Sequence, residues 1–469
     1  MAVATSPTSS SVNLAETGKL WRLALPLMGA QLAQMGMGVT DAIMAGNYSS
    51  LDLAGVALGG SVFWPTMMLM MGLLQALTPT ISQLNGANRV SDIGEVVRQG
   101  MWLALIGGLS AAVLLNQIGV VYSWLDVDPD PAEISIEYLR MCSYGIPALL
   151  MFFSLRFLAD GIGFTRPAFF ISIAALLLKI PLNYVLIYGL FGLPELGGVG
   201  CGVAQAIIMW WQLLLITLVV TRKRFHATTW MSKMSWPQWL HIKPLLVLGI
   251  PIGATIFAEM GLFSITTLLL GRFGSEVVSS HNIAMNLNGV LFMPALALGM
   301  ASTIRIGFRI GAGETSQARG TALIAMLSTI AVAIVGCILI FIFREDMVSL
   351  YTQEEEVVRL AATLLLFVVF FLVFDASQAT AAGALRGYKD TRVPMWIALF
   401  SYWGVGLPLE CILGFGWIGE PMGLYGFWIG LAAGVGTAAI LLSARLYLTS
   451  GNLERIKQYS EIEAQQASS

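Results

Sequence analysis

Long stretches without a charged residue constrain the fold of this chain more than any other feature of its sequence. Six stretches contain no Asp, Glu, Lys or Arg: residues 53–88, 99–125, 196–221, 277–304, 320–343 and 421–444. A helix needs about 20 mainly apolar residues to cross the hydrocarbon core of a bilayer, and each stretch is long enough. Only 11% of the 469 residues are charged, against about 25% in an ordinary soluble domain. The composition therefore excludes a soluble fold.

Six further stretches complete the set of expected membrane spans. Five of them are interrupted by a single charge: 23–51 by Asp41, 167–194 by Lys179, 244–271 by Glu259, 360–385 by Asp375, and 393–419 by Glu410. The sixth is shorter, lies around 134–158 and is flanked by Arg140 and Arg156. Together the stretches predict an all-α polytopic membrane protein with twelve transmembrane helices.

The distribution of basic residues predicts the orientation in the membrane. If the N-terminus is cytoplasmic, the 25 Lys and Arg residues fall on cytoplasmic loops and tails, except for Lys179 within a span and Arg140, Arg272, Arg344 and Arg359 on outer loops. Cytoplasmic loops of membrane proteins carry such an excess of basic residues. We therefore expect a multi-pass protein of the cytoplasmic (inner) membrane with both termini in the cytoplasm.

The chain repeats itself at an offset of 225 residues. This offset aligns Pro26 with Pro251, Gly36 with Gly261 and Gly198 with Gly423. An even number of spans per repeat gives both halves the same orientation, so we expect two six-helix lobes related by a pseudo-two-fold axis along the membrane normal. The predicted segments are a disordered cytoplasmic tail (1–18), an N-lobe (19–221), a cytoplasmic linker (222–242), a C-lobe (243–448) and a cytoplasmic tail (449–469).

Two lobes with Pro and Gly in many spans favour a transporter that works by alternating access, although a duplicated chain is also compatible with a static channel. The net charge of −2 offers no basis for binding nucleic acid. The four cysteines are widely spaced within apolar stretches, which is typical of packing residues and not of a metal site. We expect no cofactor, and a monomer whose partners are small molecules and lipid.

Carboxylates within spans are the candidate functional residues, because a charge there costs about 2.5–3.5 kcal/mol on insertion scales. Glu259 and Asp375 lie at similar depths in spans that start from opposite sides. Burial and a neighbouring carboxylate favour protonation, while a bound cation favours the ionised form, so such a pair exchanges cations. A proton, Na+ or an organic cation would each neutralise it. The alternative is a salt bridge with a purely structural role.

Polar residues predict a second patch in the N-lobe and a third in the C-lobe. Gln34 and Asp41 share one helix face, as do Lys179 and Asn183. The N-lobe patch is either an ionisable site or a buried ion pair between Lys179 and Asp41. In the C-lobe, Asn282 and Asn286 lie four residues apart and would present amides to a cavity or to a neighbouring helix. We expect Glu410 at the membrane interface.

These residues resemble the multidrug and toxic compound extrusion (MATE) transporters, in particular their NorM-like bacterial branch. The resemblance covers nearly the whole chain after residue 18. It rests on these stretches: LALPLMGAQLAQMGMGVTDAIMAG with Pro26, RPAFFISIAALLLKIPLNYVLIYG, GGVGCG at 197–202, IFAEMG with Glu259, FDASQA with Asp375, and RGYKDTRVP at 386–394.

The resemblance implies a secondary active exporter of hydrophobic, mostly cationic drugs and dyes in exchange for inward Na+ or H+. It matches Glu259 and Asp375 to a C-lobe cation site, Asp41 with Gln34 and Asn183 to an N-lobe site, and Pro26 to a bend in the first span. Lys179 departs from the family pattern, which tends to have Asn at this position. If Lys179 is charged and points at Asp41, an N-lobe sodium site is not expected.

Two other functions are weighed against drug export. One is a lipid-precursor flippase of the same superfamily, which would need a basic cavity for a pyrophosphate headgroup. The other is a membrane enzyme of the polyprenyl transferase type, which would need paired carboxylates for Mg2+ on a cytoplasmic face. The sequence leaves open the coupling ion and which lobe binds the drug.

Overall fold

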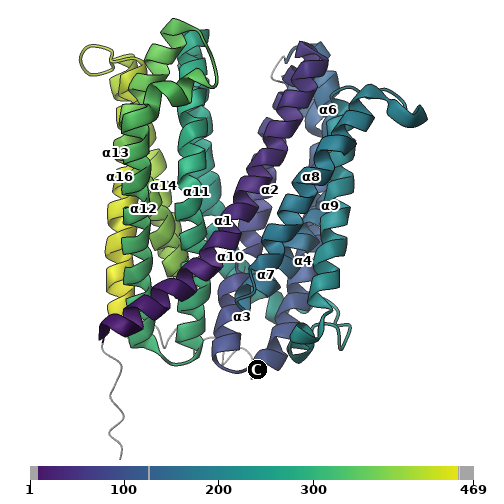
Figure 1. The fold of residues 1–469 in the computed structure, drawn as a ribbon, viewed down its shortest axis with the longest axis vertical. Helices are drawn as coiled ribbons and strands as arrows, with labels where there is room; N and C mark the ends of the chain where they lie inside the picture. Colours follow the sequence, from purple (N-terminus) through teal and green to yellow (C-terminus); the bar gives the residue numbers. More distant parts are fainter. Residues whose placement is uncertain (1–8, 125–126, 453, 455–469) are drawn as a thin grey trace, which may run out of the picture. The chain divides into compact units, whose positions relative to one another are not determined.

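All regular secondary structure in the computed structural model is helical over the residues it describes (Figure 1). These residues are 9–124, 127–452 and 454, with side chains described from residue 14. The helices of the first half are α1 (Ser9–Tyr48), α2 (Ser50–Leu74), α3 (Leu77–Gly86), α4 (Ile93–Asn116), α5 (Ile118–Trp124), α6 (Pro129–Ser143), α7 (Ile146–Gly161), α8 (Arg166–Tyr188) and α9 (Val199–Val220). Three short 3₁₀ turns accompany them: η1 (Val90–Asp92), η2 (Leu190–Gly192) and η3 (Lys223–Thr228).

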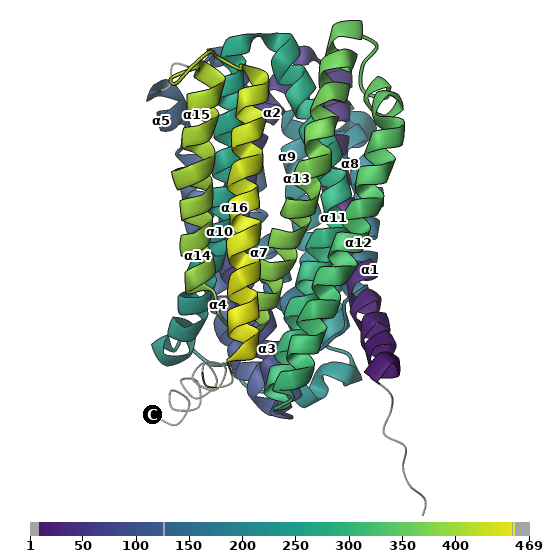
Figure 2. The ribbon, with the colours of Figure 1, turned by 90° about the vertical axis from the view of Figure 1, so that its left-hand side faces the viewer.

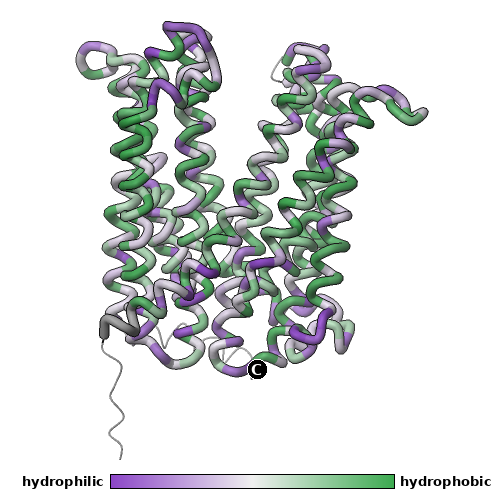
Figure 3. Tube along the Cα trace, in the orientation of Figure 1, coloured by the Kyte–Doolittle hydropathy of each residue, from purple (hydrophilic) through white to green (hydrophobic). Residues whose placement is uncertain are grey.

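The second half contains longer helices. They are α10 (Trp239–Leu270), α11 (Ser275–Gly311), α12 (Thr315–Ser349), α13 (Glu355–Gly387), α14 (Arg392–Leu399), α15 (Leu407–Phe415) and α16 (Leu424–Gly451), with a 3₁₀ turn η4 (Gly271–Phe273). A π-helical segment, η5 (Phe400–Gly406), joins α14 to α15 as one span. Apolar residues dominate along the helices, and polar residues gather at their ends (Figure 3).

Ten helical segments of the described chain are long and apolar enough to cross a membrane. An eleventh is obtained when α6 and α7, which are bent by 49° relative to each other, count as one span. The twelve expected spans are therefore not all recovered by length and composition. The expected span that is not recovered is α1. Its 40 residues are long enough to cross a membrane, but its apolar stretch contains Gln31, Gln34 and Asp41. The protein is thus a polytopic helical membrane protein.

Two compact units divide the chain, and their borders lie inside helices. The N-terminal unit comprises residues 26–253, and the C-terminal unit comprises residues up to 25 together with residues from 254 onward. The borders therefore fall within α1, at Leu25 and Pro26, and within α10, at Gly253 and Ala254. Of the lobe boundaries expected from the sequence, those at 19, 243 and 448 lie within α1, α10 and α16, and the one at 221 directly follows α9.

The N-terminal tail expected to be disordered through residue 18 is partly helical, because α1 begins at Ser9. Residues 1–8 lie outside the described residues. The physical reason lies in Glu16, whose carboxylate accepts hydrogen bonds from Arg305, Arg309 and Thr321 of the C-terminal unit. These bonds hold the start of α1 against α11 and α12.

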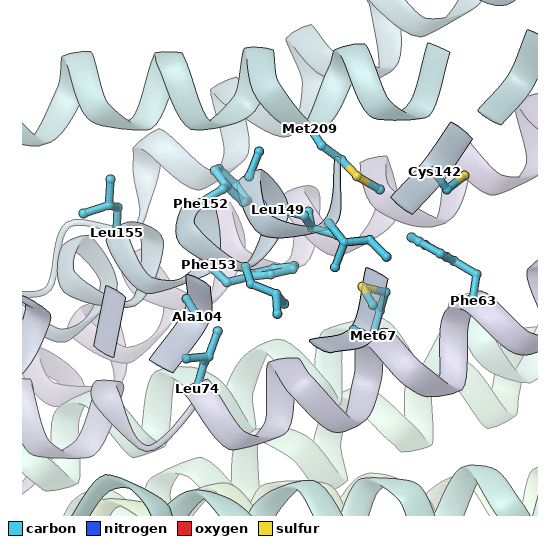
Figure 4. Close-up of a cluster of buried hydrophobic side chains, with 14 of the residues drawn as sticks. Phe63, Met67, Leu74, Ala104, Cys142, Leu149, Phe152, Phe153, Leu155 and Met209 are labelled. Carbon is cyan, nitrogen blue, oxygen red and sulfur yellow. The ribbon is translucent and has the colours of Figure 1, made fainter. Parts of the chain in front are cut away.

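In the N-terminal unit, α7 packs closely against α4 and α9. Figure 4 shows Leu149, Phe152 and Phe153 of α7 in the buried cluster with Met67 of α2 and Met209 of α9. The packing of α4 on α7 is close because a Cβ added at Gly108 would lie 2.7 Å from the Cα of Pro147.

Arg156 does not lie at the edge of a span, where the sequence predicts it. The side chain is buried in α7, and its Nε lies 3.5 Å from the Oδ2 of Asp160, one helical turn away. An acid at i+4 lies on the same helix face as the arginine and compensates its charge inside the unit.

In the C-terminal unit, α13 packs against α11, α12 and α16 (Figure 2). The approach of α13 to α11 depends on two glycines, since a Cβ added at Gly383 would lie 2.3 Å from the backbone oxygen of Gly299. The same two helices are joined by a hydrogen bond from Asn288 of α11 to Asp375 of α13.

Candidate functional site

Two carboxylates of the C-terminal unit bind one amide group. Glu259 lies on α10 and Asp375 on α13, and the Nε2 of Gln378 donates to Glu259 Oε1 at 2.8 Å and to Asp375 Oδ1 at 3.1 Å. Gln378 can reach Asp375 because residues three apart on a helix lie on the same face. The structure thus brings together the two carboxylates that the sequence places at similar depths.

Two further side chains orient this cluster. Tyr402, in the π-helical segment η5, donates its hydroxyl to Gln378 Oε1. Because this bond occupies the amide oxygen, both N–H groups of Gln378 are directed at the carboxylates. Asn288 of α11 donates its Nδ2 to Asp375 Oδ2 at 3.4 Å. Glu259 is half-buried, and the other side chains of the cluster are buried: Asp375, Gln378, Asn288 and Tyr402.

The donors that this site offers its carboxylates are neutral amides. Arg386 adds a positive charge to the surroundings of Glu259. Two ionised carboxylates in an apolar region need compensation by a proton or a cation. The arrangement is therefore chemically suited to reversible uptake of a small cation or a proton, and Glu259 and Asp375 are the residues that would hold it.

Asp41 in the N-terminal unit is compensated differently. Lys179 of α8 donates its ammonium to Asp41 Oδ2 at 2.7 Å, and Asn183, one turn further along α8, donates its amide to Asp41 Oδ1 at 2.8 Å. The ammonium also donates to Gln205 Oε1 of α9. Lys179 is only 1% exposed. The buried ion pair that the sequence left as one of two possibilities is therefore formed.

Other polar residues singled out in the sequence lie outside these two clusters. Gln34 is half-buried and makes no side-chain hydrogen bond within the described residues. Asn282 and Asn286 are exposed, and Asn286 donates to the backbone oxygen of Asn282. Asn288, whose amide donates to Asp375, lies two residues beyond Asn286 and therefore on the opposite side of α11. Asn282 and Asn286 thus point away from the carboxylates.

Glu410, which the sequence predicts at the membrane interface, is fully buried within the C-terminal unit. Its Oε2 accepts a hydrogen bond from Thr266 Oγ1 at 2.7 Å. The burial follows from close helix packing, because a Cβ at Gly430 of α16 would lie 2.3 Å from the backbone nitrogen of Glu410. Glu410 is thus a buried carboxylate of this unit that lies outside the Glu259 and Asp375 cluster.

A polytopic helical protein with buried, partnered carboxylates in each of two units has the features of a secondary transporter. A comparison with family models supports this class, because the MatE model matches residues 26–185 and 251–412. The two matched segments begin at Pro26 and Pro251, the pair aligned by the 225-residue repeat.

Relatives of similar length match the chain over nearly its whole extent. The multidrug resistance protein PmpM of Pseudomonas aeruginosa is 42% identical, with 97% of this chain and 95% of that protein covered. The multidrug resistance protein NorM of Vibrio cholerae is 40% identical, with coverages of 92% and 95%. MdtK of Yersinia pseudotuberculosis is 41% identical, with the same coverages.

Solved structures share the fold. The crystal structure of the eukaryotic MATE transporter AtDTX14 has a TM-score of 0.88 at 23% identity, covering 96% of this chain and 99% of that one. An outward-facing multidrug resistance MATE transporter of the MOP superfamily has a TM-score of 0.85 at 20% identity, with coverages of 96% and 100%. The chain belongs to the MATE family of transporters. It is therefore a transporter and not an enzyme of the polyprenyl transferase type.

Proposed function

We propose that the chain exports hydrophobic, mostly cationic compounds across the cytoplasmic membrane in antiport with inward Na+ or H+. The observation that carries this proposal is the Gln378 amide, which donates to the half-buried Glu259 and to the buried Asp375 and so brings the two carboxylates to one point. Relatives about 40% identical are multidrug resistance proteins, which favours drug export over the flipping of a lipid precursor.

The coupling follows from charge. When the carboxylates face the outside, they take up Na+ or H+, and the neutralised site binds a cationic compound more weakly. When the units rock to expose the site to the cytoplasm, the coupling ion dissociates and the negative charge attracts a new cationic compound. Because linkage is reciprocal, the compound weakens ion binding by the same factor by which the ion weakens binding of the compound.

Asp41 is assigned a different part in this proposal. Both of its carboxylate oxygens already accept hydrogen bonds, from Lys179 and Asn183. The tethered ammonium of Lys179 takes the place of a mobile cation, so the coupling ion binds at the C-terminal pair. Pro26, at the border of the two units within α1, is the proposed bending point. We further propose a monomer with both termini in the cytoplasm.

Efflux of ethidium from energised cells tests the role of the pair. Glu259→Gln and Asp375→Asn are expected to abolish efflux at normal expression, because each removes one of the two charges that the ion and the drug compete for. Glu410→Gln serves as the matched control, since it neutralises a buried carboxylate of the same unit outside the cluster. Efflux that persists in both pair variants would refute the assignment.

The coupling ion is identified with purified protein in liposomes. A sodium gradient and a proton gradient are imposed separately, and ethidium transport is followed under each. Transport driven by one gradient and lost in Glu259→Gln supports coupling at the pair. Transport that proceeds at the same rate without any gradient would rule out antiport.

A further inference from the structure

A cavity of about 320 Å³ lies within the N-terminal unit, between α4, α7 and the segment that follows η3. Its apolar wall includes Trp102 and Leu105 of α4, Met151 of α7 and Met234. Arg98 and Lys233 supply basic groups. None of these residues belongs to the Asp41 cluster, and the transport mechanism uses none of them.

The cavity has a polar end and an apolar end. Arg98, Trp102 and Leu105 are spaced four and three residues apart, so they share one face of α4. Leu105 lies about 10 Å along the helix axis from Arg98, at 1.5 Å per residue. Since α4 is a candidate membrane span, the basic end lies at the start of the span, and the apolar end lies deeper.

Hydrogen bonds fix the aromatic wall before any ligand binds. The indole N–H of Trp102 donates to the Ser235 backbone oxygen at 2.8 Å, and that of Trp230 donates to the Val220 backbone oxygen at 2.9 Å. The Arg98 guanidinium is also hydrogen-bonded within the protein. It donates to the side chains of Glu95 and Ser235 and to the backbone oxygens of Thr229 and Trp230. Its guanidinium charge is balanced by Glu95.

Lys233 is the basic residue of the cavity whose charge is not balanced. It is exposed and has no hydrogen-bond or ion-pair partner within the described residues. No Asp or Glu occurs from residue 196 to residue 258, a stretch that also contains Arg222, Lys223, Arg224 and Lys243. The rim therefore carries a net positive potential, which repels a cationic drug and attracts an anion.

We propose that this cavity binds an anionic phospholipid of the adjacent leaflet, with the headgroup phosphate at Lys233 and part of one acyl chain against Leu105 and Met151. The surface beside it suits a lipid interface, since Trp236 and Trp239 are 75% and 67% exposed, and tryptophan is enriched at the level of lipid headgroups. The volume is at the lower end for ligand sites, about 300–1,000 Å³, which fits part of a chain better than a whole drug.

Native mass spectrometry of the purified full-length protein tests the site, with palmitoyl-oleoyl phosphatidylglycerol and phosphatidylcholine as probes. The wild-type protein is expected to retain phosphatidylglycerol in preference. Lys233→Gln is expected to weaken its binding about fivefold, the factor for one basic residue at an anionic surface. Lys243→Gln is the matched control, because Lys243 is also exposed but does not line the cavity.

A second pair of variants tests the acyl-chain position. Leu105→Trp fills the apolar end and is expected to abolish preferential retention, whereas Leu109→Trp adds the same group one turn further along α4 at a position already 53% exposed. Equal retention of the two lipids by the wild-type protein would overturn the proposal. Equal losses in Lys233→Gln and Lys243→Gln, or unchanged retention in Leu105→Trp, would also overturn it.

Discussion

At the scale of single residues, Lys179 and Asp41 stabilise each other in a region where water cannot. Each is nearly fully buried, and the two are joined by a 2.7 Å ion pair. Removing one partner of a buried pair costs about 3–5 kcal/mol, because the other charge is left uncompensated. Replacing both partners with neutral groups removes the charges together and is often neutral. The pair is therefore expected to behave as a unit.

Thermal unfolding of the detergent-purified protein checks this coupling. Lys179→Met and Asp41→Asn are each expected to destabilise the protein by about 3–5 kcal/mol. The double variant is expected to unfold near the wild-type temperature, because no unpaired charge remains. If the double variant loses as much free energy of unfolding as the two single variants together, the two residues act independently.

Tyr402 acts on the carboxylate pair through Gln378. Tyr402→Phe leaves the amide of Gln378 without the hydroxyl donor that orients it. A hydrogen bond of this kind contributes about 0.5–1.5 kcal/mol, so the ion concentration for half-maximal efflux is expected to rise about two- to tenfold. Tyr388→Phe is the control, since the Tyr388 hydroxyl has no hydrogen-bond partner within the described residues. An equal rise in both variants would contradict the positioning role.

The sequence predicted the charged members of the two clusters but not their neutral partners. Glu259, Asp375 and Asp41 stand out because each is the single acid of an apolar span. Gln378 is detectable only through its spacing of three residues from Asp375. Tyr402 and Gln205 lie on other helices and have no signal in the sequence. The burial of Glu410 has no signal in the sequence either, because its position along the chain does not show that α16 packs against it.

At the scale of elements, glycines determine how closely α11 and α13 approach. The backbone oxygen of Gly299 would lie 2.3 Å from a Cβ at Gly383, a distance at which something must shift. The Gln378 and Asn288 amides meet Asp375 from these two helices. Widening the contact would therefore also separate the groups of the candidate ion site.

Gly383→Ala tests this contact. We expect it to cost about 1–3 kcal/mol through overpacking and to lower ion-driven efflux. Gly320→Ala in α12 is the matched control, because nothing lies within 4 Å of the added Cβ, and it is expected to stabilise the helix by about 0.5–1 kcal/mol. Unfolding temperatures and efflux rates of the two variants measure the difference. A Gly383→Ala protein as stable as Gly320→Ala would contradict the argument.

The helices themselves were largely predictable, because charge-free stretches of about 20 residues have few alternatives in a membrane. Their breaks were not. The 49° bend between α6 and α7 and the π-helical segment around Tyr402 depend on tertiary packing. Span borders at 19 and 243 were inferred from charge, whereas the helices α1 and α10 extend further toward the N-terminus, to Ser9 and Trp239.

At the scale of the whole molecule, the unit borders inside α1 and α10 mean that each repeat begins with a helix shared by both units. The first part of α1, up to residue 25, is held in the C-terminal unit by Glu16. The Glu16 carboxylate accepts hydrogen bonds from Arg305, Arg309 and Thr321. The part of α1 beyond residue 25 belongs to the N-terminal unit, so this helix is one of two that connect the units.

Glu16 also makes this attachment sensitive to pH. Burial acts to raise the pKa of Glu16, but the hydrogen bonds and charges of Arg309 and Arg305 outweigh it and hold the pKa below the usual value. A carboxyl whose folded-state pKa is lowered contributes stability above its unfolded pKa, about 4.3, and loses it as the pH falls through the folded value. The attachment is therefore complete at neutral pH and weakens only in acid below that range.

Glu16→Gln is expected to loosen residues 14–25 of α1 at neutral pH, because the amide cannot replace a carboxylate between two guanidinium groups. Loss of one charged hydrogen bond, about 1.5–3 kcal/mol, predicts at least tenfold faster hydrogen exchange in this segment. Efflux should fall as well, since α1 would no longer transmit movement between the units. Glu314→Gln is the control, because Glu314 bonds Arg309 but is not part of α1. Faster exchange in both variants, or unchanged exchange in Glu16→Gln, would show that Glu16 does not hold the helix.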